Sequence, residues 1–112
     1  MCIVFKTDKK IGLPTDDTLD SIYSSNPHGG GVAWVYTEPN GKKRISYVKG
    51  LMTVSAFKTE VKKAFECLSK DDDYLIAHTR ISTSGGISPQ KTHPFKTKRG
   101  FAFSKWCDSY SI

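Results

Sequence analysis

The chain has 112 residues, enough for one small domain with a thin hydrophobic core. Apolar residues make up 38% and charged residues 25%, which are the proportions of an ordinary globular protein. No apolar run approaches the roughly 20 residues that span a membrane, and we expect no export leader. The sequence therefore predicts a single domain over residues 1–112, located in the cytoplasm and not inserted in a membrane.

The cysteines are Cys2, Cys67 and Cys107, an odd number without a CxxC pair. This pattern argues against a disulfide framework and fits a reducing cytosol.

The formal net charge is +6, and much of the excess lies near the C-terminus. The basic residues there are Lys91, Lys96, Lys98, Arg99 and Lys105. They form either a solvated face or a surface that attracts nucleic acid or an acidic partner. The solvated face is favoured, because no nucleic-acid recognition motif accompanies the cluster.

Residue patterns predict the secondary structure in chain order. A β-branched and aromatic run at residues 2–5 predicts a strand. Residues 14–17 then offer a helix cap, followed by apolar residues at helical spacing. The stretch Asn-Pro-His-Gly-Gly-Gly at residues 26–31 ends that helix and is expected to be irregular.

The middle of the chain carries two runs, residues 32–36 and 74–77, that are apolar at every position. Such runs are typical of strands covered on both faces. Residues 39–41 predict a tight turn, after which residues 44–48 return as a hairpin. The clearest helix is predicted by an apolar face made of Val54, Phe57, Val61, Ala64, Phe65 and Leu68.

The remaining segments complete an α+β prediction. Three aspartates at residues 71–73 predict a solvated connection, and residues 81–99 read as a long loop. A last short strand is expected at residues 101–103. The two fully apolar strands require more covering layers than a chain of this length supplies.

Cys2 is the sharpest chemical feature of the sequence. Removal of Met1, which a small following residue favours, would make Cys2 the N-terminal residue. One residue would then carry both a thiol nucleophile and an α-amine, whose ordinary pKa of about 7.7–8.0 suits a general base. The alternative is a small buried hydrophobe at a strand start, because cysteine is among the most buried residue types.

Four segments occur in order: Met-Cys-Ile-Val at 1–4, Asn-Pro-His-Gly-Gly-Gly-Val-Ala at 26–33, Ile-Ala-His-Thr-Arg at 76–80 and Thr-His-Pro-Phe at 92–95. This series resembles the class II, N-terminal-nucleophile glutamine amidotransferases, and within them the small stand-alone branch. The resemblance covers about residues 1–104. It implies an N-terminal-nucleophile hydrolase-like αββα sandwich, here incomplete, that hydrolyses the amide of glutamine and releases ammonia without a cofactor.

The resemblance also implies roles for individual residues. Cys2 matches the nucleophile that forms a thioester with glutamine. Arg80 matches the arginine that binds the α-carboxylate of the substrate, with Thr79 and His78 beside it. A planar guanidinium suits this task because it meets a carboxylate bidentately. The alternative for Arg80 is an ordinary surface arginine.

Two further segments complete the implied site. Gly29 and Gly31 match a glycine turn where backbone approaches the nucleophile strand closely, although a plain loop gives the same pattern. His93, Pro94 and Phe95 match the segment that anchors a loop over the site, with His93 structural and not a general base. The histidines and cysteines lack metal-ligand spacing, so no metal site is expected.

The chain departs from the family pattern at three places. Ile3 follows the cysteine where the family usually has glycine, and His28 stands where the family usually has aspartate. Lys105 and Trp106 stand where the family has the Asn-Gly that supplies oxyanion-hole donors. Losing one such donor costs on the order of 10²–10³ in rate. We expect a truncated or frameshifted relative in which residues 105–112 form an atypical tail.

Three functions stay open. The first is glutamine hydrolysis through Cys2, reduced or lost because the oxyanion donors are missing. The second is a non-catalytic binding or inhibitory module, a role that would suit a small phage-encoded protein. A homodimer contact or a protein partner would then cover the incomplete sandwich. The third and least favoured is a basic nucleic-acid-binding protein, with Phe101 and Trp106 among lysines.

Overall fold

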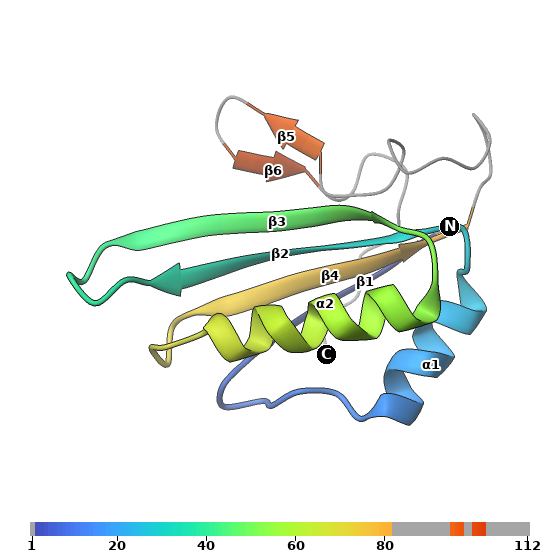
Figure 1. Cartoon of the computed structure of the whole chain (residues 1–112), viewed down its shortest axis with the longest axis horizontal. Coiled ribbons are helices and arrows are strands. Elements are labelled where there is room, and N and C mark those ends of the chain that lie inside the picture. The colour runs from blue at the N-terminus through green and yellow to red at the C-terminus, as the bar shows by residue number, and fades with distance from the viewer. Residues whose placement is uncertain (1, 82–94, 98–99, 103–112) are drawn as a thin grey trace.

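The computed structural model describes residues 2–81, 95–97 and 100–102. A four-stranded antiparallel sheet of order β1-β4-β2-β3 carries both helices on one face, which confirms the α+β class (Figure 1). Two further strands, β5 and β6, pair with each other in a separate sheet. The elements are β1 (Cys2–Asp8), α1 (Asp16–Ser25), β2 (Gly30–Thr37), β3 (Lys43–Leu51), α2 (Val54–Cys67), β4 (Tyr74–Arg80), β5 (Phe95–Thr97) and β6 (Gly100–Ala102).

Helix α1 begins where the sequence supplies a cap. The Thr15 hydroxyl accepts a hydrogen bond from the Thr18 N–H at 3.2 Å, which satisfies one of the amides that a helix start leaves unpaired. Asp16 and Asp17 in the first turn interact favourably with the helix dipole. The predicted apolar face is the buried one, and it consists of Leu19, Ile22 and Tyr23.

Helix α2 is capped in the same way, because the Thr53 hydroxyl accepts a hydrogen bond from the Ala56 N–H at 3.1 Å. The predicted apolar face is buried at its centre, but Val54 at its N-terminal end is 36% exposed. The buried members are Phe57, Val61, Ala64 and Leu68.

The hydrophobic core lies between the two helices and the sheet. Its largest fully buried apolar side chains are Phe5, Phe57, Leu19 and Leu75, each worth roughly 1.5–3 kcal/mol of transfer free energy. Tyr23 packs on Phe57 with ring centroids 5.6 Å apart, and its hydroxyl donates to the Leu51 carbonyl at 3.1 Å. Burial raises the pKa of Tyr23, so the hydroxyl stays a neutral donor.

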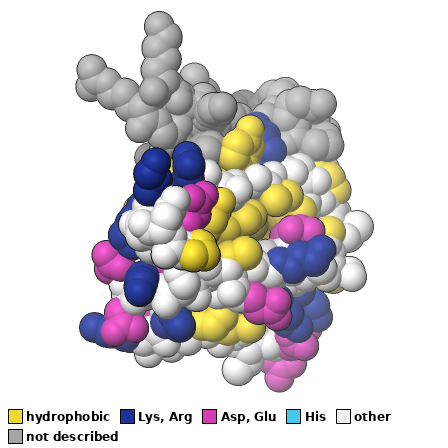
Figure 2. Space-filling view, turned by 60° about the vertical axis from the view of Figure 1, so that its left-hand side comes forward, with side chains coloured by type: hydrophobic (Ala, Val, Ile, Leu, Met, Phe, Trp, Pro, Cys, Tyr) yellow, Lys and Arg dark blue, Asp and Glu magenta, His cyan; other side chains and the backbone are white. Residues whose placement is uncertain are grey.

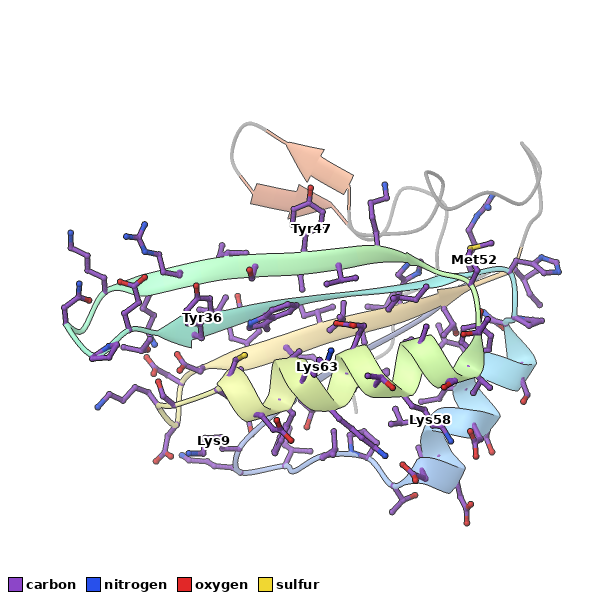
Figure 3. All side chains as sticks on the ribbon, in the orientation of Figure 1. Lys9, Tyr36, Tyr47, Met52, Lys58 and Lys63 are labelled. Atoms are coloured by element: carbon purple, nitrogen blue, oxygen red, sulfur yellow. The ribbon has the colours of Figure 1, made fainter. Side chains whose placement is uncertain are left out.

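The helices are also joined at the surface. Lys58 of α2 lies beside α1 (Figure 3), and its Nζ is 2.9 Å from a carboxylate oxygen of Asp20. Lys62 pairs with Asp16 at 2.6 Å. Because these pairs are partly exposed, solvent screens them and each contributes little to the free energy of unfolding.

Strand β2 is less covered than its sequence indicates. The prediction that residues 32–36 are covered on both faces holds only for the first two, which are buried, whereas the last three are half-buried. The reason is that the helices cover one face alone. On the other face Ile45, the register partner of Val35, is 55% exposed, and Tyr47 points away from the helices (Figure 3).

Two segments predicted to be irregular contain strand. Gly30 and Gly31 begin β2, where both pair with β4 and the register against β3 shifts between them. Pairing with neighbouring strands overrides the low strand propensity of glycine. Phe95–Thr97 form β5 within the predicted loop at residues 81–99. The expected last strand is present as Gly100–Ala102.

The prediction of a solvated connection at residues 71–73 is wrong for Asp73, whose side chain is fully buried. Its carboxylate joins the ends of β2 and α2 to the starts of β3 and β4. Its donors are the Thr37 N–H (3.1 Å) and hydroxyl (2.8 Å), the Ser69 N–H (2.9 Å), the Lys70 N–H (2.9 Å) and Lys43 Nζ (2.7 Å). Burial alone would raise the pKa of Asp73, but these donors outweigh it and hold the pKa far below its ordinary value.

Replacing Asp73 with alanine leaves several buried donors without their acceptor. We expect the free energy of unfolding to fall by about 3–5 kcal/mol. Asp72→Ala is the matched control, since Asp72 also pairs with Lys43 but its side chain is 74% exposed. Solvent screens an exposed pair, so Asp72→Ala should lower the free energy of unfolding much less. Urea denaturation of both variants measures the difference, and equal losses would contradict the structural role given to Asp73.

The lowered pKa of Asp73 also predicts a pH dependence. An unfolded aspartate has a pKa of about 3.9, and the folded value lies below it. The stabilisation is therefore complete well above the unfolded pKa and is lost as pH falls toward the folded pKa. We expect the stability difference between the native chain and Asp73→Ala to stay constant from about pH 7 to 5 and to shrink below about pH 4. A difference that grew on acidification would argue against a charged Asp73 in the folded state.

Candidate functional site

Strand pairing brings three distant candidate segments to one end of the sheet. In the ladder between β1 and β4, residue 2 is the direct register partner of Arg80. In the ladder between β2 and β4, Gly31 pairs with His78 and Gly30 pairs with Thr79. The start of β1, the start of β2 and the end of β4 are therefore neighbours in space.

The side chains of the three residues at the end of β4 do not all point to the same face of the sheet. Successive residues of a strand point to opposite faces, so His78 and Arg80 share one face and Thr79 lies on the other. The Thr79 hydroxyl donates to the Ile22 carbonyl of α1 at 3.2 Å, which directs Thr79 into the helical layer and away from Arg80. His78 and Thr79 are fully buried and Arg80 is 6% exposed.

The loop between α1 and β2 is bonded to the same strand end. The Arg80 N–H donates to the Gly29 carbonyl and the His28 N–H donates to the Arg80 carbonyl, both at 2.8 Å. The side-chain amide of Asn26 donates to the Thr79 carbonyl at 3.4 Å. Gly29 has φ +117°, a left-handed value that favours glycine. The predicted glycine turn thus lies next to Arg80.

The atoms around residue 30 leave space only for glycine, although the sequence does not single out this position. A Cβ added there would lie 2.9 Å from the Phe57 ring of α2 and 3.0 Å from the His78 carbonyl of β4. The close approach predicted for Gly29 and Gly31 concerns the nucleophile strand, whereas the contacts at Gly30 are with α2 and β4. The run of three glycines was the available signal, but a run cannot show which member faces the helix.

The third predicted segment is only partly described. His93 and Pro94 lie outside the described residues, as do Lys105 and Trp106. Phe95 is the first residue of β5, and its register partner is Ala102 of β6.

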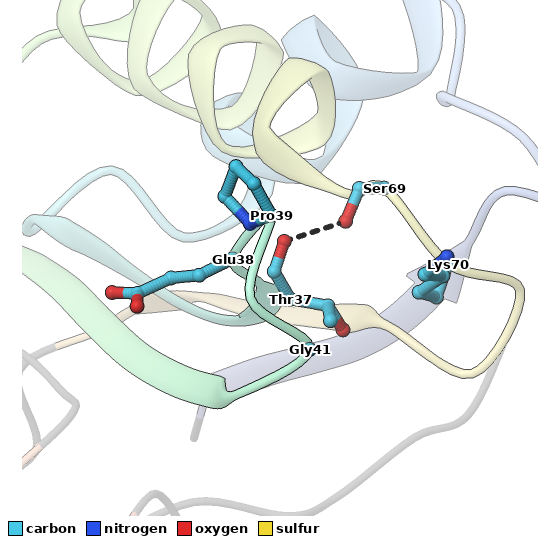
Figure 4. Close-up of a pocket in the computed structure, with 6 residues that line it drawn as sticks. All are labelled: Thr37, Glu38, Pro39, Gly41, Ser69 and Lys70. Atoms are coloured by element: carbon cyan, nitrogen blue, oxygen red, sulfur yellow. Dashed lines mark hydrogen bonds between the residues drawn. The ribbon is translucent and has the colours of Figure 1, made fainter.

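Two pockets lie away from residue 2 and Arg80. The first, of about 240 Å³, sits where β2 ends and α2 leads into β4, and the Ser69 hydroxyl donates to the Thr37 carbonyl there at 2.8 Å (Figure 4). The second, of about 300 Å³, lies where the chain leads from β1 into α1. Both are at or below the lower end of the usual range for ligand pockets, about 300–1,000 Å³. No predicted site residue lines either of them.

Charges of both signs are mixed on the described surface. Figure 2 shows hydrophobic side chains surrounded by basic and acidic ones on the face it displays. Lys43, Arg44, Lys58 and Lys62 each pair with a carboxylate. Nucleic-acid-binding surfaces instead cluster unpaired basic residues on one face. The basic residues on which the nucleic-acid hypothesis rests lie elsewhere: Lys91, Lys98, Arg99 and Lys105 are outside the described residues, so that hypothesis stays a prediction.

Searches for other kinds of site give two findings about the described part of the chain. No three His, Cys, Asp or Glu side chains gather there as a metal site would require. No helix there is long and apolar enough to cross a membrane.

Comparison with known proteins adds no relative. No family model, no curated protein and no solved structure matches the chain.

The close approach at Gly30 predicts a specific coupling with Phe57. Gly30→Ala should lower the free energy of unfolding by about 1–3 kcal/mol, because the new methyl group must displace the ring or the strand. Phe57→Leu makes room on one side, so the double variant should lose less stability than the sum of the single losses. A double-mutant cycle in urea measures this coupling. Strictly additive losses would show that the Phe57 ring does not restrict residue 30.

Proposed function

We propose that this chain is a glutaminase-type protein related to the class II glutamine amidotransferases. In this proposal removal of Met1 makes Cys2 the N-terminal nucleophile, and Arg80 binds the α-carboxylate of glutamine. The observation that carries the proposal is the register pairing of residue 2 with Arg80. Directly opposite residues of antiparallel strands have Cβ atoms about 4.5–5.5 Å apart. A glutamine bonded to the thiol of residue 2 would therefore lie within reach of a guanidinium at residue 80.

The proposed reaction needs only groups carried by residue 2 and water. The α-amine takes the thiol proton, and the thiolate attacks the amide carbon of glutamine to form a tetrahedral oxyanion. As the oxyanion collapses, the C–N bond breaks, and the protonated amine gives its proton to the leaving nitrogen, which departs as ammonia. Water, deprotonated by the same amine, then hydrolyses the thioester to glutamate and regenerates the thiol.

The surroundings of Arg80 suit a carboxylate-binding role. Arg80 is 6% exposed, so a substrate carboxylate would meet its guanidinium where water screens the interaction poorly. The backbone of Arg80 is bonded to Gly29 and His28, in addition to its pairing with β1. These bonds support a fixed position for the guanidinium stem, and a fixed bidentate donor binds more selectively than a mobile lysine.

The proposed fold is one half of an αββα sandwich. The four-stranded sheet with helices on a single face is compatible with such a half. We further propose that turnover is weak, because Lys105 and Trp106 replace the family's oxyanion donors. If their losses add, the missing stabilisation of the transition state exceeds about 5 kcal/mol.

Covalent labelling separates the nucleophile from turnover. The test uses a background with Cys67 and Cys107 changed to serine, since Cys67 is an exposed free cysteine, and protein whose intact mass shows loss of Met1. A diazoketone analogue of glutamine should label Cys2 slowly, while ammonia release from glutamine stays near background. Arg80→Lys should slow this labelling by removing the bidentate clamp. Peptide mass mapping identifies the labelled residue.

The controls decide between the outcomes. Cys2→Ala should abolish labelling, and protein that retains Met1 should not be labelled at residue 2 by the glutamine analogue. A labelling rate that Arg80→Lys leaves unchanged would contradict substrate binding by Arg80. Ammonia release at an ordinary enzymatic rate, about 1–10³ per second, would overturn the expectation of weak turnover and mean that other groups supply the oxyanion hole.

A further inference from the structure

The end of β4 depends on the end of α1 for its position. The ladder between β2 and β4 stops at the pair Gly30–Thr79, so Arg80 lies one residue beyond it. On that side Arg80 is bonded only to loop backbone, through Gly29 and His28, among the backbone bonds of the described residues. A strand end that is hydrogen-bonded to a loop is only as rigid as that loop. Terminal residues without fixed partners unfold locally at a low free-energy cost.

Asn26 fixes that loop. It caps the C-terminus of α1, where its N–H donates to the Tyr23 carbonyl at 3.1 Å, and Pro27 follows it. Its side-chain amide donates to the Thr79 carbonyl at 3.4 Å, and the residue is 4% exposed. Asn26 is therefore held by the helix through its backbone and by the strand through its side chain.

Thr79 makes the reciprocal connection. Its hydroxyl donates to the Ile22 carbonyl at 3.2 Å, and the whole residue is buried. The last turn of a helix leaves carbonyls without an intrahelical partner, so this hydroxyl satisfies a group that burial would otherwise leave unpaired. Together the two hydrogen bonds fix the position of the end of β4 relative to α1, one residue before Arg80.

We propose that Asn26 and Thr79 are positioning residues. They hold Arg80 in the position at which its guanidinium contacts a substrate bonded to Cys2. This inference rests on the proposed function. It goes further by assigning a role in substrate selectivity to two residues whose side chains hydrogen-bond between β4 and the end of α1.

The test compares two reagents on the same cysteine, in the chain with Cys67 and Cys107 changed to serine and Met1 removed. The diazoketone analogue of glutamine carries the α-carboxylate that Arg80 would bind, whereas iodoacetamide carries none. The ratio of their labelling rates at Cys2 therefore measures placement of Arg80, while a change in thiol reactivity or exposure alters both rates together. Asn26→Asp, which keeps the shape but loses the amide donor, and Thr79→Val, which loses the hydroxyl, should each lower the ratio about 2- to 10-fold.

Ser25→Ala is the matched control, because Ser25 neighbours Asn26 but its hydroxyl donates only within α1, to the Ser21 carbonyl at 2.9 Å. Its ratio should equal that of the unchanged background. Circular dichroism restricts the comparison to variants that are folded. If the background chain prefers the glutamine analogue and both variants keep that preference, the positioning role is wrong while the proposed function stands. If the background chain shows no preference, both proposals fail.

Discussion

The pairing of β4 with two neighbours is the constraint on which the rest of the structure depends. β4 is hydrogen-bonded to β1 on one side and to β2 on the other, so its register determines which residues these two strands present to the core. A slip of one residue would turn Leu75 and Ala77 out of the core. The same slip would remove residue 2 from its place opposite Arg80. Stability and the candidate site are thus consequences of one register.

The two ends of β4 are fixed by different chemistry. At its start the buried carboxylate of Asp73 accepts hydrogen bonds from three other segments of the chain. At its end the bonds of Thr79 and Asn26 connect it to α1. A charged centre tolerates little change because its donors need an anion, whereas neutral hydrogen bonds tolerate isosteric replacement at a moderate cost.

The features that the sequence predicts correctly are those with local causes. Both helices follow from a threonine cap and apolar residues at helical spacing, and both are present. The sequence does not predict the roles of Asp73 and Gly30, because these roles depend on residues distant in the chain. The buried state of Asp73 requires Lys43 and Thr37, and the need for glycine at position 30 arises from Phe57. No short-range pattern contains that information.

In the candidate site, too, the sequence predicts some features and misses others. The motif order placed Cys2, the glycine loop and Arg80 in one hypothesis, and the strand pairing makes their backbones neighbours. Residue spacing did not reveal that Thr79 faces the helices, although alternation along a strand would have separated it from Arg80. Proximity in a fold does not establish a reaction, since the same scaffold supports many functions.

The order in which strands can pair has a consequence for the N-terminus. β2 and β3 are joined by a short turn, whereas β1 and β4 close the longest loop in the sheet. Loop-closure entropy grows with loop length, so the hairpin forms at a lower entropic cost than the ladder between β1 and β4. During synthesis residue 2 is made long before Arg80 and cannot pair until β4 exists. β1 therefore takes its place in the sheet only after β4 has been made.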